Sequence, residues 1–171
     1  MPDTTRRVVT GHDRRGKSVV LSDGPPPQNH PMHGPEVGAD FHEMWGDAGP
    51  VPEIAAQPAR EPNERPFTLM PTSGHLLRIL DVYPLGTGGK RTVMHRTQTI
   101  DYVVVISGEL VLILDDSEVI LRSGDVVVQR GTDHAWENRG ASVARAAFFH
   151  VDARFSAQLL AQLPQPLALL R

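Results

Sequence analysis

The chain has 171 residues, of which 40% are hydrophobic and 22% are charged, and its formal net charge is -3. These values suit one domain with a packed core and some residues left over for arms or tails. No basic stripe accompanies this balance, so nucleic acid is not expected as a partner. The absence of cysteine excludes disulfides and thiolate sites and leaves His, Asp and Glu as the ligands for any metal.

The N-terminal stretch and the apolar runs of the sequence indicate where in the cell the protein is expected. The N-terminal stretch MPDTTRRVVTGHD carries charges and no apolar segment, so it is not expected to be a signal peptide. No apolar run approaches the length that spans a bilayer. We therefore expect a cytoplasmic protein with no membrane partner.

Residues 1–24 predict a β hairpin, with apolar centres at Val8–Val9 and Val19–Leu21 around a polar turn. Residues 25–66 hold most of the 15 prolines. Because proline removes amide donors and restricts the residue before it, this segment is expected to be an extended arm with one short strand around Phe41–Trp45. The arm would pack over the body or over a partner subunit, and the alternative is a disordered linker.

Residues 67–153 predict a β-barrel or sandwich. Apolar runs alternate here with Gly, Asp and Ser at short intervals, which is typical of antiparallel all-β folds. The stretch ELVLILDDSEVIL indicates a hairpin that turns at Asp115–Asp116–Ser117. In residues 154–171 the Leu spacing predicts a short amphipathic helix as far as Leu163, followed by a tail that proline interrupts.

Polar residues stand just before two of these apolar runs. His95 and Asp101 lie in HRTQTIDYVVVISG, residues 95–108, and His134 lies in GDVVVQRGTDHAWEN, residues 124–138. Polar groups at the entries of neighbouring strands can converge at one open end of a small barrel. These three side chains are therefore expected to meet in a pocket with an aliphatic wall.

The two segments, with a hairpin between them, resemble the paired motifs of the cupin superfamily. The first motif reads Gly, five residues, His-x-His, three or four residues, Glu, six residues, Gly. The second reads Gly, five residues, Pro-x-Gly, two residues, His, three residues, Asn. The resemblance covers roughly residues 74–152 and implies the cupin double-stranded β-helix, or jelly-roll barrel. Three positions depart from the pattern: Thr97 replaces a His, Asp101 replaces the Glu and Gln129 replaces the proline. The second motif is also one residue shorter between Gly124 and the turn.

A divalent metal ion is one cofactor that the resemblance implies. A typical member offers three His and one Glu, whereas the matching positions here offer His95, Asp101 and His134. Such a set would suit Zn, Mn, Fe, Ni or Cu. Loss of one imidazole weakens divalent-metal affinity, so a metal-free acid–base set stays open as the alternative. His75 and His150, both on β runs, are candidates for a fourth ligand.

Four more residues are candidates for substrate contacts. Thr97 lies within the first motif, and Arg96 and Arg130 flank the site residues, where they could clamp an anionic substrate. The alternative for both arginines is surface charge at the barrel rim. Trp136 is a candidate for a pocket wall or for a packing residue.

The leading functional hypothesis is a small-molecule enzyme of the lyase, isomerase (dehydratase) or dioxygenase type. Its substrate would be a small oxygenated or carboxylated metabolite held in the barrel. The alternatives are a non-catalytic barrel that binds a small molecule and a structural partner in a larger assembly. The resemblance also implies a homodimer.

Overall fold

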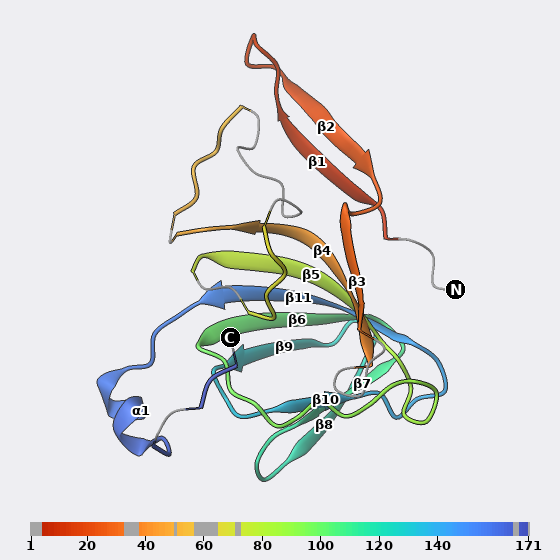
Figure 1. The fold of residues 1–171 in the computed structure, drawn as a ribbon, viewed down its shortest axis with the longest axis vertical. Helices are drawn as coiled ribbons and strands as arrows, with labels where there is room; N and C mark the ends of the chain where they lie inside the picture. Colours follow the sequence, from red (N-terminus) through yellow and green to blue (C-terminus); the bar gives the residue numbers. More distant parts are fainter. Residues whose placement is uncertain are drawn as a thin grey trace.

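The structure is a computed structural model that describes residues 5–32, 38–49, 51–56, 65–70, 73–165 and 168–170. Within these ranges the chain forms antiparallel sheets and one short helix, so the all-β expectation is confirmed (Figure 1). The elements are β1 (Arg7–His12), β2 (Ser18–Gly24), β3 (Gln28–Met32), β4 (Ala39–Asp47), β5 (His75–Val82), β6 (Thr99–Ser107), β7 (Glu109–Ile113), β8 (Glu118–Arg122), β9 (Val126–Arg130), β10 (Ala135–Glu137), β11 (Ala144–Asp152) and α1 (Ala157–Gln162).

Two sheets enclose the core. The larger sheet has the strand order β3-β4-β5-β11-β6-β9, and the smaller one has the order β10-β7-β8. Figure 1 shows the smaller sheet below the larger one. The main cluster of buried apolar side chains lies on their facing sides: Ala39, Phe41, Val82, Val103, Val105, Leu110, Leu112, Leu121, Trp136, Ala144, Ala146 and Phe148.

Strand β6 shows how the sequence assigns its two faces. Asp101, Val103 and Val105 are buried, whereas Tyr102 and Val104 between them are exposed. This alternation is the period of two that a half-buried strand requires. The inner face therefore carries aliphatic side chains along most of its length and a carboxylate near its first end.

The chain passes from the larger to the smaller sheet at Gly108, between β6 and β7. Its φ is 78°, and a Cβ here would lie 2.8 Å from the Cα of Ala144. Only glycine adopts this backbone conformation and this close approach without strain. The chain then forms the β7–β8 hairpin that the sequence predicts, closed by a hydrogen bond from Leu114 N to Ser117 O.

The expected arm contributes more strand than predicted. Strand β4 is longer than the expected Phe41–Trp45 segment and pairs with both β3 and β5, and β3 itself was not anticipated. Pro31 is accommodated because β3 is an edge strand, where one side of the backbone needs no partner. Of the expected arm, residues 33–37, 50 and 57–64 lie outside the described part of the chain.

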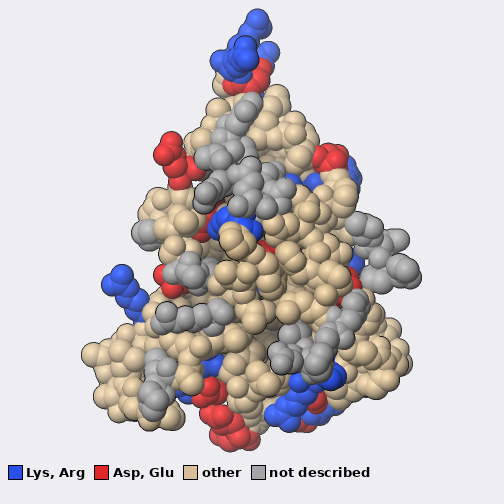
Figure 2. Space-filling model, in the orientation of Figure 1, with Lys and Arg blue, Asp and Glu red and all other residues tan. Residues whose placement is uncertain are grey.

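Strands β1 and β2 pair with each other and stand away from the two sheets (Figure 1). Their connecting turn carries Arg14, Arg15 and Lys17, which are exposed. Figure 2 shows basic side chains gathered at this tip, whereas charges of both signs alternate along the opposite end of the same face. The expected N-terminal hairpin is therefore present as a projecting element.

Helix α1 begins after Ser156, whose side chain accepts a hydrogen bond from Leu159 N. It ends at Gln162, one residue before the predicted limit, and none of its residues is buried. No helix in the described ranges has the length and apolar character needed to cross a membrane.

Candidate functional site

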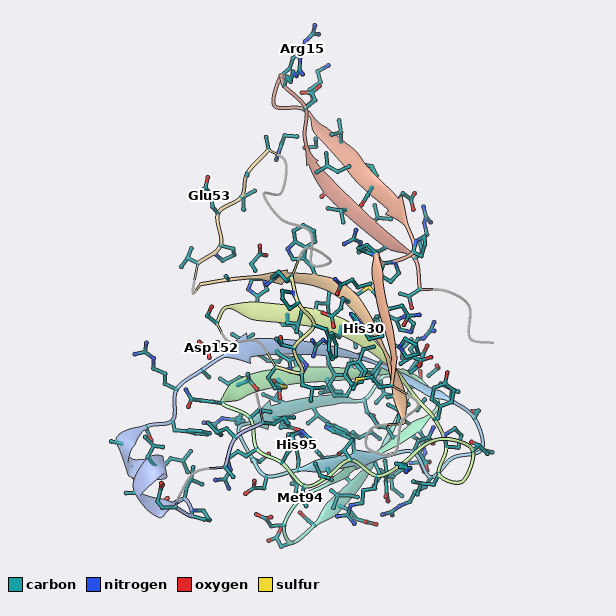
Figure 3. The ribbon with its side chains drawn as sticks, viewed as in Figure 1. Arg15, His30, Glu53, Met94, His95 and Asp152 are labelled. Atoms are coloured by element: carbon teal, nitrogen blue, oxygen red, sulfur yellow. The ribbon has the colours of Figure 1, made fainter. Side chains whose placement is uncertain are left out.

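Two histidines that are far apart in the sequence form the centre of the candidate site. His95 lies in the segment before β6, and His134 lies just before β10. The backbones of the two residues exchange two hydrogen bonds of 2.9 Å. Their imidazole rings lie 4.1 Å apart between centroids, and Figure 3 shows His95 between β9 and β10. The two motifs thus place their histidines side by side.

Both imidazoles are oriented by their own backbone. His134 Nδ1 lies 2.9 Å from Thr132 O, and His95 Nδ1 lies 2.8 Å from Val93 O. Because a carbonyl oxygen only accepts, each Nδ1 carries the proton in the neutral ring and donates it. The lone pair of each neutral imidazole is therefore on Nε2, which is the atom each ring presents away from its own loop.

Asp101 is held by two neighbours on the inner face of the larger sheet. The register places it opposite Gln129 of β9 and opposite His150 of β11. Gln129 Nε2 donates to Asp101 Oδ2 over 3.0 Å, and His150 Nδ1 donates to Asp101 Oδ1 over 2.8 Å. Gln129 Nε2 also lies 3.1 Å from His134 Nε2. Asp101 is therefore connected to the histidine pair through the Gln129 amide and not by a direct hydrogen bond.

Burial sets the charge state of His134. Only 3% of the residue is exposed. Burial, assisted by the adjacent His95, lowers the pKa of His134 to about 4, against weaker opposing effects from the Thr132 carbonyl and nearby carboxylates. A proton on His134 would be isolated from water, which disfavours the charged form. His134 is therefore neutral at pH 7.

Two of the substrate-contact candidates lie beside this cluster. Thr97 is 1% exposed, and its Oγ1 accepts a hydrogen bond of 2.9 Å from Thr99 Oγ1. Arg96 is also buried and donates to Asp133. Asp133 balances the charge of the Arg96 guanidinium, and a contact between Arg96 and an anionic substrate stays a prediction.

The other two candidates differ in position. Trp136 is 7% exposed and makes edge-on contacts with Phe148 at 5.5 Å and with His134 at 6.2 Å. It thus packs in the core and touches the site with one edge. Arg130 is exposed and follows Gln129 on β9, so it faces away from the cluster. Neighbouring residues of a strand point to opposite faces, so Arg130 is not beside the cluster, and a contact with an anionic substrate stays a prediction.

The residues present do not fit a metal ion as they are arranged. No three His, Asp or Glu side chains within the described ranges form a group that could hold one. Both oxygens of Asp101 already accept hydrogen bonds, and the amide of Gln129 lies between this carboxylate and His134. No step of the chemistry below is therefore assigned to a bound metal.

The role of Gln129 is not predicted from the sequence, and His150 is there only one of two candidates for a fourth ligand. His150 points inward and contacts Asp101, whereas His75 is on the outer face, where its Nε2 lies 3.3 Å from Asp47 Oδ2. The alternation of buried residues along β11 could have assigned His150 to the inner face. The one feature of the sequence that pointed to Gln129 is its position in the second motif, where proline is usual.

Comparisons with known proteins agree with the motifs. A family model described as a cupin domain matches residues 80–151. Phomopsin biosynthesis cluster protein D of Diaporthe leptostromiformis is 36% identical over 159 residues, which cover 88% of this chain and 80% of that protein. The cupin-domain-containing oxidoreductase srdD of Neurospora crassa is 43% identical over 148 residues, which cover 77% of this chain and 65% of that protein.

A solved structure supports the fold independently. A Salmonella typhimurium protein named for ethanolamine utilization (protein Q) superposes with a TM-score of 0.50. The match covers 88% of this chain and 98% of that chain at 12% sequence identity. At this identity the likeness concerns the arrangement of the strands alone.

Proposed function

Because the chain belongs to the cupin family and has its double-stranded β-helix fold, we propose that it is an enzyme that moves protons on a small oxygenated or carboxylated metabolite. The reaction would be of the lyase or isomerase (dehydratase) type. The observation that carries this proposal is the pair of adjacent imidazoles, His95 and His134, linked to Asp101 inside the barrel. Relatives named for biosynthesis clusters and as oxidoreductases support a small-molecule enzyme.

His95 is the residue to which we assign proton transfer. With Nδ1 donating to Val93 O, its Nε2 has a lone pair that can accept a proton from a substrate carbon or hydroxyl. The residue is only partly buried, unlike its neighbour. A small molecule arriving from outside would therefore meet His95 before it meets the interior of the site.

His134 and Asp101 are assigned positioning roles. A neutral His134 beside His95 avoids the repulsion that two imidazolium rings would experience at this separation. His150 and Gln129 each donate to one oxygen of Asp101, which fixes the carboxylate in place, so we assign it the ordering of its neighbours instead of proton abstraction. The arrangement resembles a base supported by a rigid hydrogen-bonded shell.

Two other functions have support of their own. An oxidoreductase is favoured by several relatives that are named cupin-domain-containing oxidoreductases, and a metal-dependent dioxygenase is the form that we consider here. A non-catalytic barrel that binds a small molecule is favoured by Asp101, whose two oxygens already accept hydrogen bonds from Gln129 and His150. The first requires that turnover depend on an added divalent metal, and the second requires binding without turnover.

The experiment follows proton exchange in D2O. Protein treated with EDTA is incubated with a panel of small oxo- and hydroxycarboxylates and aldehydes, and 1H NMR monitors deuterium incorporation and product signals. We expect exchange or conversion of at least one compound, and His95→Gln should slow it by about 10²-fold or more. His75→Gln, a histidine substitution on the outer face, should leave the rate unchanged.

Two results would contradict the proposal. One is that wild-type protein broadens the signals of a compound, which demonstrates binding, and never exchanges or converts it. The other is that His95→Gln and His75→Gln have equal rates. Exchange that appears only after a divalent metal is added would favour the oxidoreductase alternative.

A homodimer through the outer face of the larger sheet is part of the same proposal. Five apolar side chains on β6 and β9 are between 39% and 60% exposed on this face: Tyr102, Val104, Ile106, Val126 and Val128. Adjacent apolar residues on two neighbouring strands form a patch of the kind that monomeric proteins seldom leave open to water. A second copy related by a two-fold axis would present the same patch to it.

A further inference from the structure

The amide of Gln129 occupies the centre of the polar cluster. Gln129 is 4% exposed, and its Nε2 lies 3.0 Å from Asp101 Oδ2 and 3.1 Å from His134 Nε2. An amide nitrogen carries two hydrogens, so one NH2 group can donate to both atoms at once. The motif that this segment matches has proline at this position, which offers no side-chain donor. The contact therefore depends on a residue that departs from the motif.

The chemistry of the neighbours fixes which way the amide points. His134 donates its Nδ1 hydrogen to Thr132 O, so its Nε2 can only accept. Asp101 Oδ2 is a carboxylate oxygen and also accepts. Rotating the amide by half a turn would direct its carbonyl oxygen at two acceptors, which is repulsive. The NH2 group therefore faces His134 and Asp101.

This orientation turns the carbonyl oxygen of the amide away from His134 and Asp101. Gln129 Oε1 is buried and has no hydrogen-bond partner within the described ranges. An unpaired buried acceptor lowers stability, so the fold tolerates it only if the bridge to His134 and Asp101 compensates. The two hydrogen bonds that the NH2 group donates account for this orientation of the amide.

We propose that the Gln129 amide replaces a divalent cation as the group that holds the lone pair of His134 and the carboxylate of Asp101 together. A metal would join the same two groups by coordination, and Gln129 joins them by two hydrogen bonds. Because the NH2 group lies between His134 Nε2 and Asp101 Oδ2, an entering cation would have to displace it from both groups, while His150 holds the other oxygen of Asp101. This inference concerns the site of the proposed function, and its test measures binding and not turnover.

Exchange of the amide for a carboxylate tests this role directly. Gln129→Glu keeps the length of the side chain and turns the two donors into acceptors. Together with His95, His134 and Asp101, the new carboxylate would complete a nitrogen and oxygen ligand set of the kind that divalent first-row metals prefer. Gln129→Leu is the matched control, because it removes the donors and adds no ligand.

The measurement is isothermal titration of Mn2+, Ni2+ or Zn2+ into tag-free protein that has been treated with EDTA. We expect Gln129→Glu to bind about tenfold tighter or more than wild type, and His95→Ala in the Gln129→Glu background to remove the gain. Wild-type affinity equal to or above that of Gln129→Glu would overturn the inference. The inference would also be overturned if wild type bound the metal most tightly and Gln129→Leu abolished that binding, because the amide would then be a ligand and not a replacement.

A second measurement needs no variant and therefore does not depend on whether Gln129→Glu folds. In 15N NMR spectra of wild-type protein, His134 should be the Nδ1–H tautomer with a hydrogen-bonded Nε2. One equivalent of Mn2+ should leave the Gln129 side-chain NH2 and the His134 ring signals sharp. Selective broadening of these signals would overturn the inference, whatever the outcome of the proton-exchange assay.

Discussion

Acid should destabilise the protein through His134. In an unfolded chain its pKa is about 6.5, whereas in the folded protein burial beside His95 lowers it to about 4. Above pH 6.5 the ring is neutral in both states and contributes no pH dependence. Between these values the unfolded state binds a proton that the folded state does not, so the free energy of unfolding falls as the pH falls. At about 1.4 kcal/mol per pKa unit, the loss is about 3 kcal/mol.

The assay compares urea unfolding of wild type and His134→Gln, followed by tryptophan fluorescence, at about pH 7.5 and about pH 4.5. Gln does not titrate, so the variant should lose about 2–3 kcal/mol less than wild type between the two pH values, even if it is less stable at both. His75→Gln should keep most of the wild-type pH dependence. The reasoning is refuted if His134→Gln and wild type lose equal stability on acidification.

Two further predictions concern the core and the outer face of the larger sheet. Arg78 is 1% exposed and donates to Glu43 over 2.5 Å, so Arg78→Met should lower the free energy of unfolding by about 3–5 kcal/mol by leaving a buried carboxylate unpaired. Arg78→Met combined with Glu43→Leu should cost much less, and equal losses in thermal unfolding would disprove the argument. Val128→Lys should convert the proposed dimer to a monomer in sedimentation experiments, whereas Val119→Lys on β8 should not; a wild-type monomer would end the dimer proposal.

Local patterns in the sequence were sufficient for most of the barrel. Strand β6 alternates buried and exposed residues, and the Asp115–Asp116–Ser117 turn lies between two apolar runs, so both elements follow from neighbours in the chain. The order and spacing of the two motifs predicted that His95 and His134 would be close, and the structure pairs their backbones. The strand and the turn depend on periodicity and turn chemistry, which a single sequence contains, whereas the nearness of the two histidines was predicted from the motif resemblance.

Features that depend on pairing between distant segments were not accessible in the same way. His150 contacts Asp101 because the β11–β6 register places the two opposite each other, and register is set by the whole sheet. The hydrogen bonds from Gln129 to Asp101 and His134 require β9, β6 and the segment before β10 to come together. Strand β3 was missed because Pro31 argues against a strand unless its position at the sheet edge is known.

The place of β4 within the larger sheet has a consequence for shortened forms of the protein. The family match begins at residue 80, yet β5 begins at His75 and is flanked on one side by β4 along its full length. A chain trimmed to the matched region would lose β4 and most of β5, which would uncover the edge of β11 that pairs with β5 and the side chain of Leu80, which lies opposite Phe41. Unpaired strand edges promote aggregation. The N-terminal third therefore protects the larger sheet from aggregation through its edge, and domain boundaries taken from family similarity alone would remove this protection.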